Sequence, residues 1–395
     1  MHTHKHILIS VGEASGDMHA ANLVQAVKKL APDVLFYGMG ANLMRNAGVD
    51  IVIYANELSI VGLLEVITKF PKIRKAFRIM QNALEHNKPD LLILVDYPGF
   101  NLRLAKIAKK AGVKALYFIS PKVWAWNQGR IESIKKYVDK MAVIFPFEVD
   151  FYKKYQVPVA FVGNPLLEIV KPKLTHEEAQ RAFKLSPNCK TIGLFPGSRK
   201  SEIKYHLPIM LEAAKLLKNQ NPDLQFLLPQ ASSITLDDLQ PYLQASSIKV
   251  QVIPNKNYDV MQVCDAIIAA SGTVTLEIAI MTIPEVIIYK KSWLEYQIAK
   301  RVIKIPYIGL CNILANKKIV QELLQYDATP ENIAKEIEKI LNDANYREEM
   351  IANLANTKNL LKDTEQENLA ELIITLLHPT IQHQPIDHAA KSFDR

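Results

Sequence analysis

The chain has 395 residues, of which 49% are hydrophobic and 22% are charged, and its formal net charge at pH 7 is +8. This composition excludes a disordered or low-complexity protein, and the length predicts two domains with sizeable cores. The positive charge favours anionic partners such as nucleotides, nucleic acid or lipid head groups, with simple solubility as the alternative.

Cysteine usage and hydropathy restrict where the protein works. The three cysteines, at positions 189, 264 and 311, are an odd number without CxxC spacing, which argues against a disulfide framework and a zinc site. The N-terminus shows no signal-peptide pattern. The most apolar stretch is interrupted by Asp265, Glu277 and Pro284 before it reaches the roughly 18 residues of a spanning helix. We therefore expect a cytoplasmic protein without a transmembrane segment.

The first half of the chain alternates short apolar runs with segments of helical period. The strand-like runs are 6–12, 91–95, 114–119 and 141–145, and helical stretches follow at 14–30 and from Leu102. This alternation predicts βαβ units, and therefore a parallel sheet with helices on both faces. We assign residues 1–170 to this first domain.

A second series of runs begins after a polar stretch near residue 170, where Thr175 and Glu178 have the spacing of a helix capping box. The runs are 191–195, 225–228, 250–253, 266–270 and 285–289, and they predict a second doubly wound domain over residues 171–365. Residues 366–395 are expected to hold the end of a C-terminal helix, which can pack back on the first domain, and a frayed tail. Ligands of such sheets bind outside the carboxyl ends of the strands, so the chemistry is expected in loops facing a central cleft.

The first strand-to-helix loop is Gly12-Glu13-Ala14-Ser15-Gly16. Its glycines allow a ligand to approach the backbone closely, and Ser15 is a candidate cap for the following helix. A helix N-terminus favours a phosphate or a polar sugar face, but Glu13 repels phosphate and suits hydroxyl or amide groups. An ordinary capped turn is the alternative.

Asp96 follows an apolar run, 91–95, that is predicted to be buried on both faces of the sheet. An unpaired carboxylate at such a place has a raised pKa and is a candidate general base. The alternative is that Asp96 caps the helix that begins near Phe100. Farther on, Trp124 and Trp126 occupy one loop, where they form either a binding wall or part of the core.

Two loops of the second domain carry the residue types of a nucleotide diphosphate site. In Gly197-Ser198-Arg199, the guanidinium can hold two phosphate oxygens at once. In Ser271-Gly272-Thr273, small residues open a helix whose N-terminus can bind an anion. Glu277 follows about one turn later, where it can accept hydrogen bonds from ribose hydroxyls. Either loop alone is more often a capped helix, but both in one domain predict the nucleotide site.

Residues 60–80 combine apolar density with a basic cluster. Such a segment fits a helix resting on anionic lipid, with a core helix that has a solvated basic end as the alternative. Pro71 is predicted to kink or break this helix. The candidate membrane-contact residues are Ile60, Val61, Leu63, Leu64, Ile67, Lys72, Arg74 and Lys75.

Seven motifs stand along the chain in one order, namely GEASGD, DYPGFN, SPKVWAW, FPFE, PGSR, SGTVTLE and PYIGLCNIL. In that order and spacing they resemble the lipid-A-disaccharide synthase family (glycosyltransferase family 19), over roughly residues 6–375. The resemblance implies an α/β GT-B fold of two Rossmann-like domains facing a central cleft. It also implies a role in lipid A biosynthesis, and so in lipopolysaccharide formation, in Gram-negative bacteria. The implied reaction joins UDP-2,3-diacylglucosamine to 2,3-diacylglucosamine 1-phosphate with inversion, giving a β-1,6-linked disaccharide 1-phosphate and UDP.

The resemblance implies roles for individual residues. Asp96 matches the family's essential aspartate and is the expected base for the acceptor 6-hydroxyl, with Glu13 as the other candidate. Arg199 is expected to neutralise the departing diphosphate, Glu277 to hold the ribose, and Glu13 to orient a sugar. The further substrate contacts expected from these motifs are Gly12, Ser15, Gly16, Asn101, Gly197, Ser198, Ser271, Gly272, Thr273 and Asn312.

The chain departs from the family pattern at two positions. Gly99 replaces an acidic residue of many relatives and Asn164 replaces a histidine, so roles known for those positions are not carried over. No metal or other cofactor is implied. The expected partners are the acylated glucosamine substrates and the inner face of the inner membrane, bound peripherally, with a homodimer as one option and no nucleic acid.

Two other classes of function remain open on the sequence. One is a different UDP-sugar enzyme of the same fold, either a soluble transferase or an epimerase. The other is a non-catalytic basic binding protein, against which stands the lack of aromatic residues interleaved with the basic ones.

Overall fold

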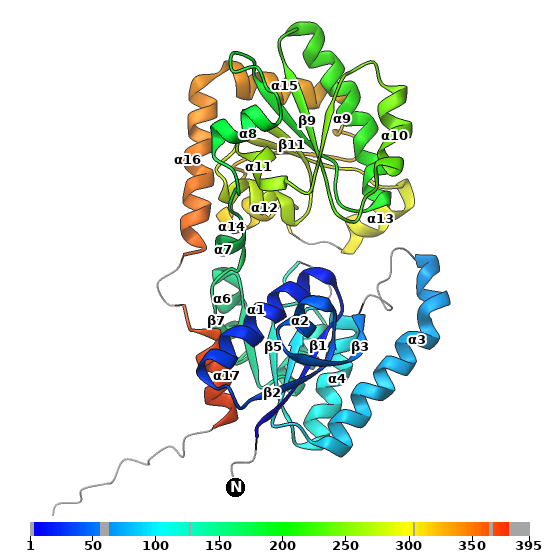
Figure 1. Cartoon of the computed structure of the whole chain (residues 1–395), viewed down its shortest axis with the longest axis vertical. Helices are drawn as coiled ribbons and strands as arrows, with labels where there is room; N and C mark the ends of the chain where they lie inside the picture. The colour runs from blue at the N-terminus through cyan, green and yellow to red at the C-terminus, as the bar shows by residue number, and fades with distance from the viewer. Residues whose placement is uncertain (1–3, 56–62, 126–127, 303–304, 363–365, 379–395) are drawn as a thin grey trace, which may run out of the picture.

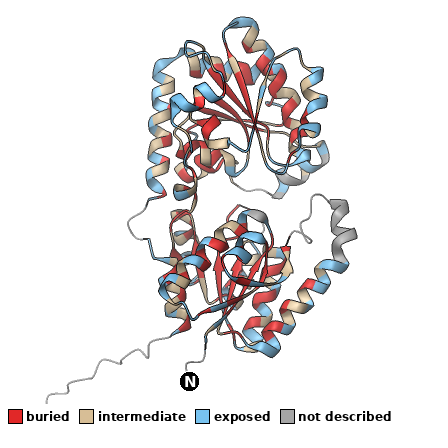
Figure 2. Ribbon diagram, in the orientation of Figure 1, coloured by how far each residue is buried: buried red, intermediate tan, exposed pale blue. Residues whose placement is uncertain are grey.

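Two parallel sheets, each covered by helices, organise the chain into two stacked α/β domains (Figure 1). The structure is a computed structural model that describes residues 4–55, 63–125, 128–302, 305–362 and 366–378. In both sheets the strands are buried at the centre of the domain, and the exposed residues gather on the outer helices (Figure 2).

The N-terminal sheet has, in the described residues, seven parallel strands in the order β3-β2-β1-β4-β5-β6-β7. The strands are β1 (His6–Val11), β2 (Leu35–Gly40), β3 (Val49–Tyr54), β4 (Leu91–Val95), β5 (Lys114–Phe118), β6 (Lys140–Val143) and β7 (Val159–Phe161). The helices are α1 (Ala14–Leu30), α2 (Asn42–Asn46), α3 (Leu63–Asn82), the π-helical η2 (Ala83–Asn87), α4 (Pro98–Ala111), α5 (Arg130–Tyr137), α6 (Pro146–Lys154) and α7 (Leu166–Ile169).

The C-terminal sheet has, over the same described ranges, six parallel strands in the order β10-β9-β8-β11-β12-β13. The strands are β8 (Thr191–Phe195), β9 (Gln225–Gln230), β10 (Gln251–Pro254), β11 (Ala266–Ala270), β12 (Glu285–Tyr289) and β13 (Gln321–Leu324). The helices are α8 (His176–Ala182), α9 (Lys200–Gln220), α10 (Leu236–Ala245), α11 (Asn257–Met261), α12 (Thr273–Ile280), α13 (Trp293–Val302), α14 (Leu310–Ala315), α15 (Pro330–Asn342), α16 (Ala344–Leu360) and α17 (Leu369–Leu377).

The strand order of both sheets reverses next to their first strand, which confirms the prediction of doubly wound sheets. In the N-terminal sheet β1 lies between β2 and β4, and in the C-terminal sheet β8 lies between β9 and β11. The connections on the two sides of such a reversal run to opposite faces of the sheet, which leaves a crevice at the carboxyl ends of the strands. The loops after β1, β4, β8 and β11 therefore border the two crevices.

All nine strand-like runs of the sequence are strands in the structure, but four further strands were not predicted. Of these, β3 and β13 lie at sheet edges and are only partly buried, so they lack a continuous apolar run. β2 is interrupted by Gly38, whose φ is 148°, and β7 is only three residues long. Short or half-exposed strands give too weak a pattern to be recognised in a single sequence.

Local predictions at helix ends have mixed outcomes. The capping box is confirmed, because Thr175 N donates to Glu178 Oε2 at 2.8 Å and Glu178 N donates to Thr175 Oγ1 at 3.2 Å. The prediction that Ser15 caps α1 is wrong, since the N-cap residue is Glu13 and Ser15 lies in the first turn. The prediction of a break at Pro71 is also wrong, because α3 continues through it to Asn82.

The predicted membrane segment is described only in part. The backbone of α3 begins at Leu63, and the three basic residues Lys72, Arg74 and Lys75 are exposed on it. No helix in the described ranges is long and apolar enough to cross a bilayer. Of the candidate contact residues, Ile60 and Val61 lie outside the described residues, as do the side chains of Leu63, Leu64 and Ile67.

The C-terminal helix α17 returns to the N-terminal domain and packs beside α1 (Figure 1). Its apolar residues Ala370, Ile373 and Leu377 are buried in the same cluster as Val24 of α1. A separate apolar cluster joins the two domains beside the cleft, and it includes Trp124, Phe145, Leu166, Leu276, Leu310 and Leu361. The chain therefore crosses between the domains twice, and apolar side chains cover the crossing.

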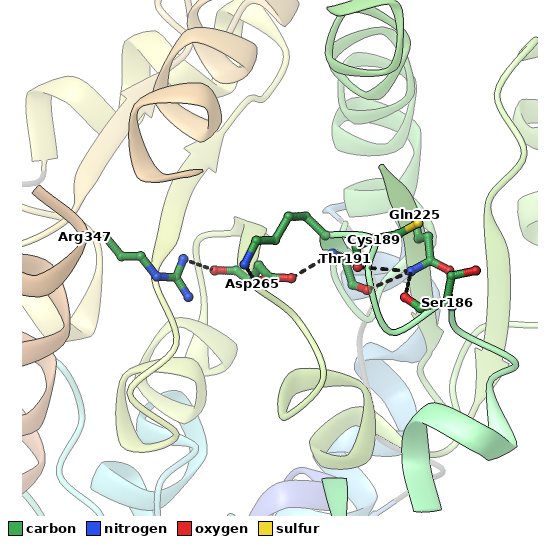
Figure 3. A network of polar contacts seen from close by, with 7 residues as sticks. Ser186, Cys189, Thr191, Gln225, Asp265 and Arg347 are labelled. Atoms are coloured by element: carbon green, nitrogen blue, oxygen red, sulfur yellow. Dashed lines mark hydrogen bonds and ion pairs between the residues drawn. The ribbon is translucent and has the colours of Figure 1, made fainter. Parts of the chain in front are cut away.

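A polar network closes the C-terminal domain at the amino ends of its strands, far from the cleft (Figure 3). Asp265 accepts a hydrogen bond from Thr191 N at 2.9 Å, and its carbonyl accepts one from Arg347 at 2.6 Å. Gln225 is bonded to Ser186 in both directions, at 2.8 and 3.1 Å. These bonds connect α16 and the loop before β8 to the sheet, so the polar network at this end of the sheet has a structural role.

Candidate functional site between the two domains

A cavity of about 600 Å³ lies between the domains, at the carboxyl ends of both sheets. Loops after β1, β4 and β5 form one wall, and loops after β8 and β11 form the other. This is the position that doubly wound sheets use for ligands. The cavity brings together eleven of the predicted site residues, which are Glu13, Ser15, Gly16, Asp96, Gly197, Ser198, Arg199, Ser271, Gly272, Thr273 and Glu277.

Asp96 stands at the end of β4, whose five residues are all buried. Both Asp96 and Tyr97 have φ of 46°, so the chain turns sharply in the left-handed region before α4 begins at Pro98. The carbonyl of Asp96 accepts hydrogen bonds from Asn101 Nδ2 at 2.7 Å and from the hydroxyl of Tyr117. These bonds fix the turn, and the Asp96 side chain lines the cavity.

Burial, together with the smaller effect of the neighbouring Glu13, raises the pKa of Asp96 from 3.8 to about 6. The hydrogen bond from Tyr97 N and the positive charge of Lys122 act against this rise in pKa. A carboxyl group with such a pKa is charged at neutral pH and still holds a proton well, which suits a general base. Asp96 does not cap α4, because Tyr97 is the N-cap residue and no side chain bonds there.

The first loop presents a carboxylate to the cavity. Glu13 is exposed and occupies the N-cap position of α1 without a capping bond from its side chain. Ser15 and Gly16, in the first turn, also line the cavity. Gly12 does not line it, since it packs under the ring of Tyr97, where any side chain would collide.

The C-terminal wall combines an arginine with two turns of small residues. Gly197 has a φ of 116°, and Glu202 accepts hydrogen bonds from Ser198 N and Arg199 N at 2.8 and 3.2 Å. The Arg199 guanidinium contacts Glu202 through Nη1 at 3.3 Å, and its side chain is 59% exposed. Most of the five N–H donors of this arginine therefore remain free for a ligand.

The loop after β11 leads directly into α12, with Gly272 as the N-cap residue and no side-chain cap. The first N–H groups of α12 thus point into the cleft without a protein cap, which is the arrangement that binds anions. Burial raises the pKa of Glu277, on the next turn, to about 7. Glu277 therefore changes between acceptor and donor near neutral pH, and either form can bond a hydroxyl group.

Two asparagines predicted to contact substrate do not line the cavity, and the structure corrects that expectation. Asn101 and Asn312 are both fully buried. Asn101 accepts from Ser10 Oγ at 2.7 Å and holds the turn at Asp96. Asn312 accepts from Ile319 N and Val320 N and donates to Val320 O and Glu322. Their polar atoms are used within the protein, so these asparagines position loops.

Several polar residues that line the cavity were missed by sequence reasoning, and His19, Lys122 and Glu148 are among them. His19 follows Ser15 by one helical turn, a spacing that could have revealed it. Lys122 and Glu148 lie inside the motifs SPKVWAW and FPFE. Each is the one charged residue of its aromatic motif, and that charge is the signal that could have revealed it. Burial raises the pKa of Glu148 to about 7, although hydrogen bonds from Trp124 Nε1 and Phe145 N oppose that rise.

Trp124 packs in the apolar cluster between the domains and also lines the cavity. It is only 8% exposed, and its ring meets that of Phe147 edge-on at a centroid distance of 5.0 Å. Trp126 lies outside the described residues. In the described part of the chain, no three His, Cys, Asp or Glu side chains are grouped so that they could hold a metal ion.

Comparisons with known proteins agree with this geometry. A family model described as lipid-A-disaccharide synthetase matches residues 7–375. The lipid-A-disaccharide synthase of Geobacter metallireducens is 50% identical over 374 residues, covering 94% of this chain and 97% of that protein. The enzyme of the same name from Nitrosococcus oceani is 49% identical over 371 residues, covering 94% and 96%.

Solved structures show the fold. MurG of Acinetobacter baumannii superposes with a TM-score of 0.55 at 14% identity, covering 95% of this chain and 99% of that one. A UDP-GlcNAc 2-epimerase from Neisseria meningitidis, bound to UDP-GlcNAc, gives 0.59 at 13% identity, covering 94% and 99%. The predicted GT-B fold, shared by these glycosyltransferases and epimerases, is confirmed.

Replacing Asp96 by Asn is expected to stabilise the folded protein above pH 6. The folded pKa of about 6 exceeds the ordinary value of 3.8, so charging this carboxyl group costs stability at higher pH. That cost declines as the pH falls from about 6 to about 4 and disappears below, where the carboxyl group is protonated in both the folded and the unfolded protein. Thermal unfolding of the variant and the wild type from pH 4 to pH 8 measures this cost. The Tm of the variant should exceed that of the wild type only at the higher pH.

Asp90→Asn is the matched control for this measurement. Although partial burial acts to raise the Asp90 pKa, bonds from Lys5 Nζ and His6 N hold it below its ordinary value. The Asp90 variant should therefore lose stability above about pH 4, the opposite sign. A Tm difference for Asp96→Asn that does not change with pH would contradict the assignment.

Proposed function

The chain belongs to the lipid-A-disaccharide synthetase family, and on that premise we propose that it transfers 2,3-diacylglucosamine from UDP to 2,3-diacylglucosamine 1-phosphate. The product is a β-1,6-linked disaccharide 1-phosphate, and UDP is released. One observation carries the proposal beyond the family relationship. A partly buried carboxylate with a raised pKa, Asp96, and a largely exposed arginine, Arg199, face one cavity from opposite domains.

The mechanism assigns the two walls to the two substrates. Asp96 accepts the proton of the acceptor 6-hydroxyl while that oxygen attacks the anomeric carbon of the donor sugar. The bond from that carbon to the diphosphate breaks, its electron pair leaves with UDP, and the α-linked sugar becomes β-linked. The proton stays on Asp96 until it passes to solvent. No covalent bond to the enzyme is needed.

The C-terminal domain stabilises the negative charge of the leaving group. Arg199 and the N-terminus of α12 supply N–H donors to the diphosphate, where negative charge grows as the bond breaks. Glu277 bonds the ribose hydroxyls, and Ser198 and Thr273 lie beside the same anion. Glu13 orients a sugar hydroxyl on the acceptor side and, by its negative charge, keeps the pKa of Asp96 high.

UDP release in detergent micelles, with each substrate omitted in turn, tests the reaction. Release that requires both acylated sugars is the expected result. Release with the donor alone would instead indicate hydrolysis or epimerisation, the chemistry of a different UDP-sugar enzyme. No release from a folded protein that binds UDP would overturn the proposal.

Asp96→Ala and Arg199→Ala should each lower kcat at least about 100-fold in this assay, as is typical for a lost general base or a lost charge-stabilising donor. Both variants should remain folded, since neither side chain supports the core. Lys110→Ala, on the exposed far end of α4, is the control and should keep its activity. Near-normal turnover in the Asp96 variant would transfer the role of base to Glu13.

The pH profile separates the roles of Asp96 and Glu13. Because a general base works deprotonated, kcat/KM should fall below an apparent pKa near the value of about 6 held by Asp96. Glu13→Gln removes a like charge that raises this pKa, so the acidic limb should move to lower pH. An acidic limb at the same pH in the Glu13 variant would show that another group titrates.

We also infer peripheral binding at the inner face of the inner membrane, through the start of α3 and the preceding residues. Exposed Lys72, Arg74 and Lys75 support it, because basic residues beside an apolar segment favour anionic lipid. Replacing Leu63, Leu64 and Ile67 by Ser should weaken sedimentation with phosphatidylglycerol-containing liposomes and leave UDP binding intact.

The matched control for that experiment replaces three exposed leucines elsewhere on the same domain, Leu30, Leu35 and Leu43. These leucines should not contribute to liposome binding, so the control variant should sediment like the wild type. Equal sedimentation of all three proteins would indicate that the start of α3 packs in the core of the domain and does not bind lipid.

A further inference from the structure

Lys122 is a cation in the wall of the cavity that has no bonded partner among the residues the structure describes. It follows β5 in the loop 119–125 and lines the space between the domains. Its side chain is accessible from the cavity, yet protein surrounds it closely enough for burial to lower its pKa. Over the part of the chain that the structure describes, its ammonium group makes no hydrogen bond, and no carboxylate oxygen lies within ion-pair distance.

The charges around Lys122 come from three elements. Asp96 after β4 and Glu148 on α6 favour its charged form, and Arg199 at the start of α9 disfavours it from the opposite domain. Neither carboxylate satisfies the lysine. Glu148 uses both oxygens for other bonds, at 3.0 Å to Trp124 Nε1 and 3.2 Å to Phe145 N. The three N–H donors of Lys122 therefore face the cavity unused.

Hydrogen bonds and packing hold the loop that carries Lys122 in a fixed position. Ser120 Oγ is bonded to Tyr152 Oη at 2.6 Å, and Ala125 N donates to Lys122 O at 3.1 Å. Trp124 is anchored to Glu148, as described above, and is buried between the domains. A partnerless ammonium on a fixed loop is preorganised for an anion that enters from the cavity.

We propose that Lys122 is the phosphate ligand of the N-terminal wall, facing Arg199 of the C-terminal wall across the cleft. The proposal rests on the function proposed above, whose two substrates both carry phosphate. A phosphate group between the two side chains replaces their mutual repulsion by attraction to a shared anion. Phosphate binding then draws the two domains together around the reacting atoms.

Two sources can supply this phosphate, namely the 1-phosphate of the acceptor and the diphosphate of the donor. Lys122→Met keeps the length of the side chain and removes its charge, and Lys122→Arg keeps the charge. Lys110→Met, at the far end of α4, makes the same change of charge away from the cavity. Because the Lys122 ammonium supports no hydrogen bond among the described residues, we expect none of the three variants to unfold below the Tm of the wild type.

Titration calorimetry with UDP and with uridine, and saturation-transfer NMR with glucosamine 1-phosphate and with glucosamine, distinguish the sources. We expect Lys122→Met to weaken binding about 10- to 100-fold, as for the loss of a charged hydrogen bond, for one phosphate-bearing probe and not for its phosphate-free partner. Weakened UDP binding identifies the donor diphosphate, and weakened glucosamine 1-phosphate binding identifies the acceptor. Lys122→Arg should retain most of the affinity.

Unchanged affinity for both phosphate probes in Lys122→Met would overturn the proposal, as would equal losses for phosphate-bearing and phosphate-free probes. If the methionine variant does not fold, Lys122→Gln answers the same question. These titrations need no turnover. A wild-type protein that binds UDP through Lys122 but forms no disaccharide would refute the proposed reaction and leave the phosphate ligand standing.

Discussion

The reversal of strand order beside β1 and beside β8 is the constraint on which the site depends. Each reversal sends neighbouring connections to opposite faces of a sheet, so that the carboxyl ends of β1 and β4, and of β8 and β11, border an open crevice. The two crevices face each other and form one cavity. At these carboxyl ends polar side chains can gather without interrupting the apolar strands.

Burial in this cavity favours the neutral form of four ionisable groups that line it. Burial is the main reason why the pKa values of Asp96, Glu148 and Glu277 are raised and that of Lys122 is lowered. Around Asp265, at the opposite end of the C-terminal sheet, the charges are instead paired within the protein (Figure 3). The charged groups in the cleft are incompletely paired within the protein, as is typical of a ligand site, whereas the paired groups around Asp265 have a structural role.

Membership of a motif does not by itself mean contact with a substrate. DYPGFN contains Asp96, which lines the cavity, and Asn101, which is buried and holds the left-handed turn that presents it. PYIGLCNIL contains Asn312, whose bonds all close the loop between α14 and β13. SPKVWAW holds both Trp124, which packs between the domains, and Lys122, which does not. A family motif thus contains both the residues that line the site and the residues that hold its loops in position.

The sequence by itself determined the two doubly wound sheets, the loops that carry the chemistry and eleven of the residues that line the cavity. It could do so because buried parallel strands are apolar throughout, and because a carboxylate or an arginine after such a strand has few structural uses. Only the tertiary structure decided which side chains face the cavity, that Asn101 and Asn312 hold loops in place, that Ser15 does not cap α1 and that Lys122 has no bonded partner among the described residues. Orientation and pairing depend on contacts between residues far apart in the chain, such as Ser10 with Asn101 and Trp124 with Glu148, and no local pattern encodes them.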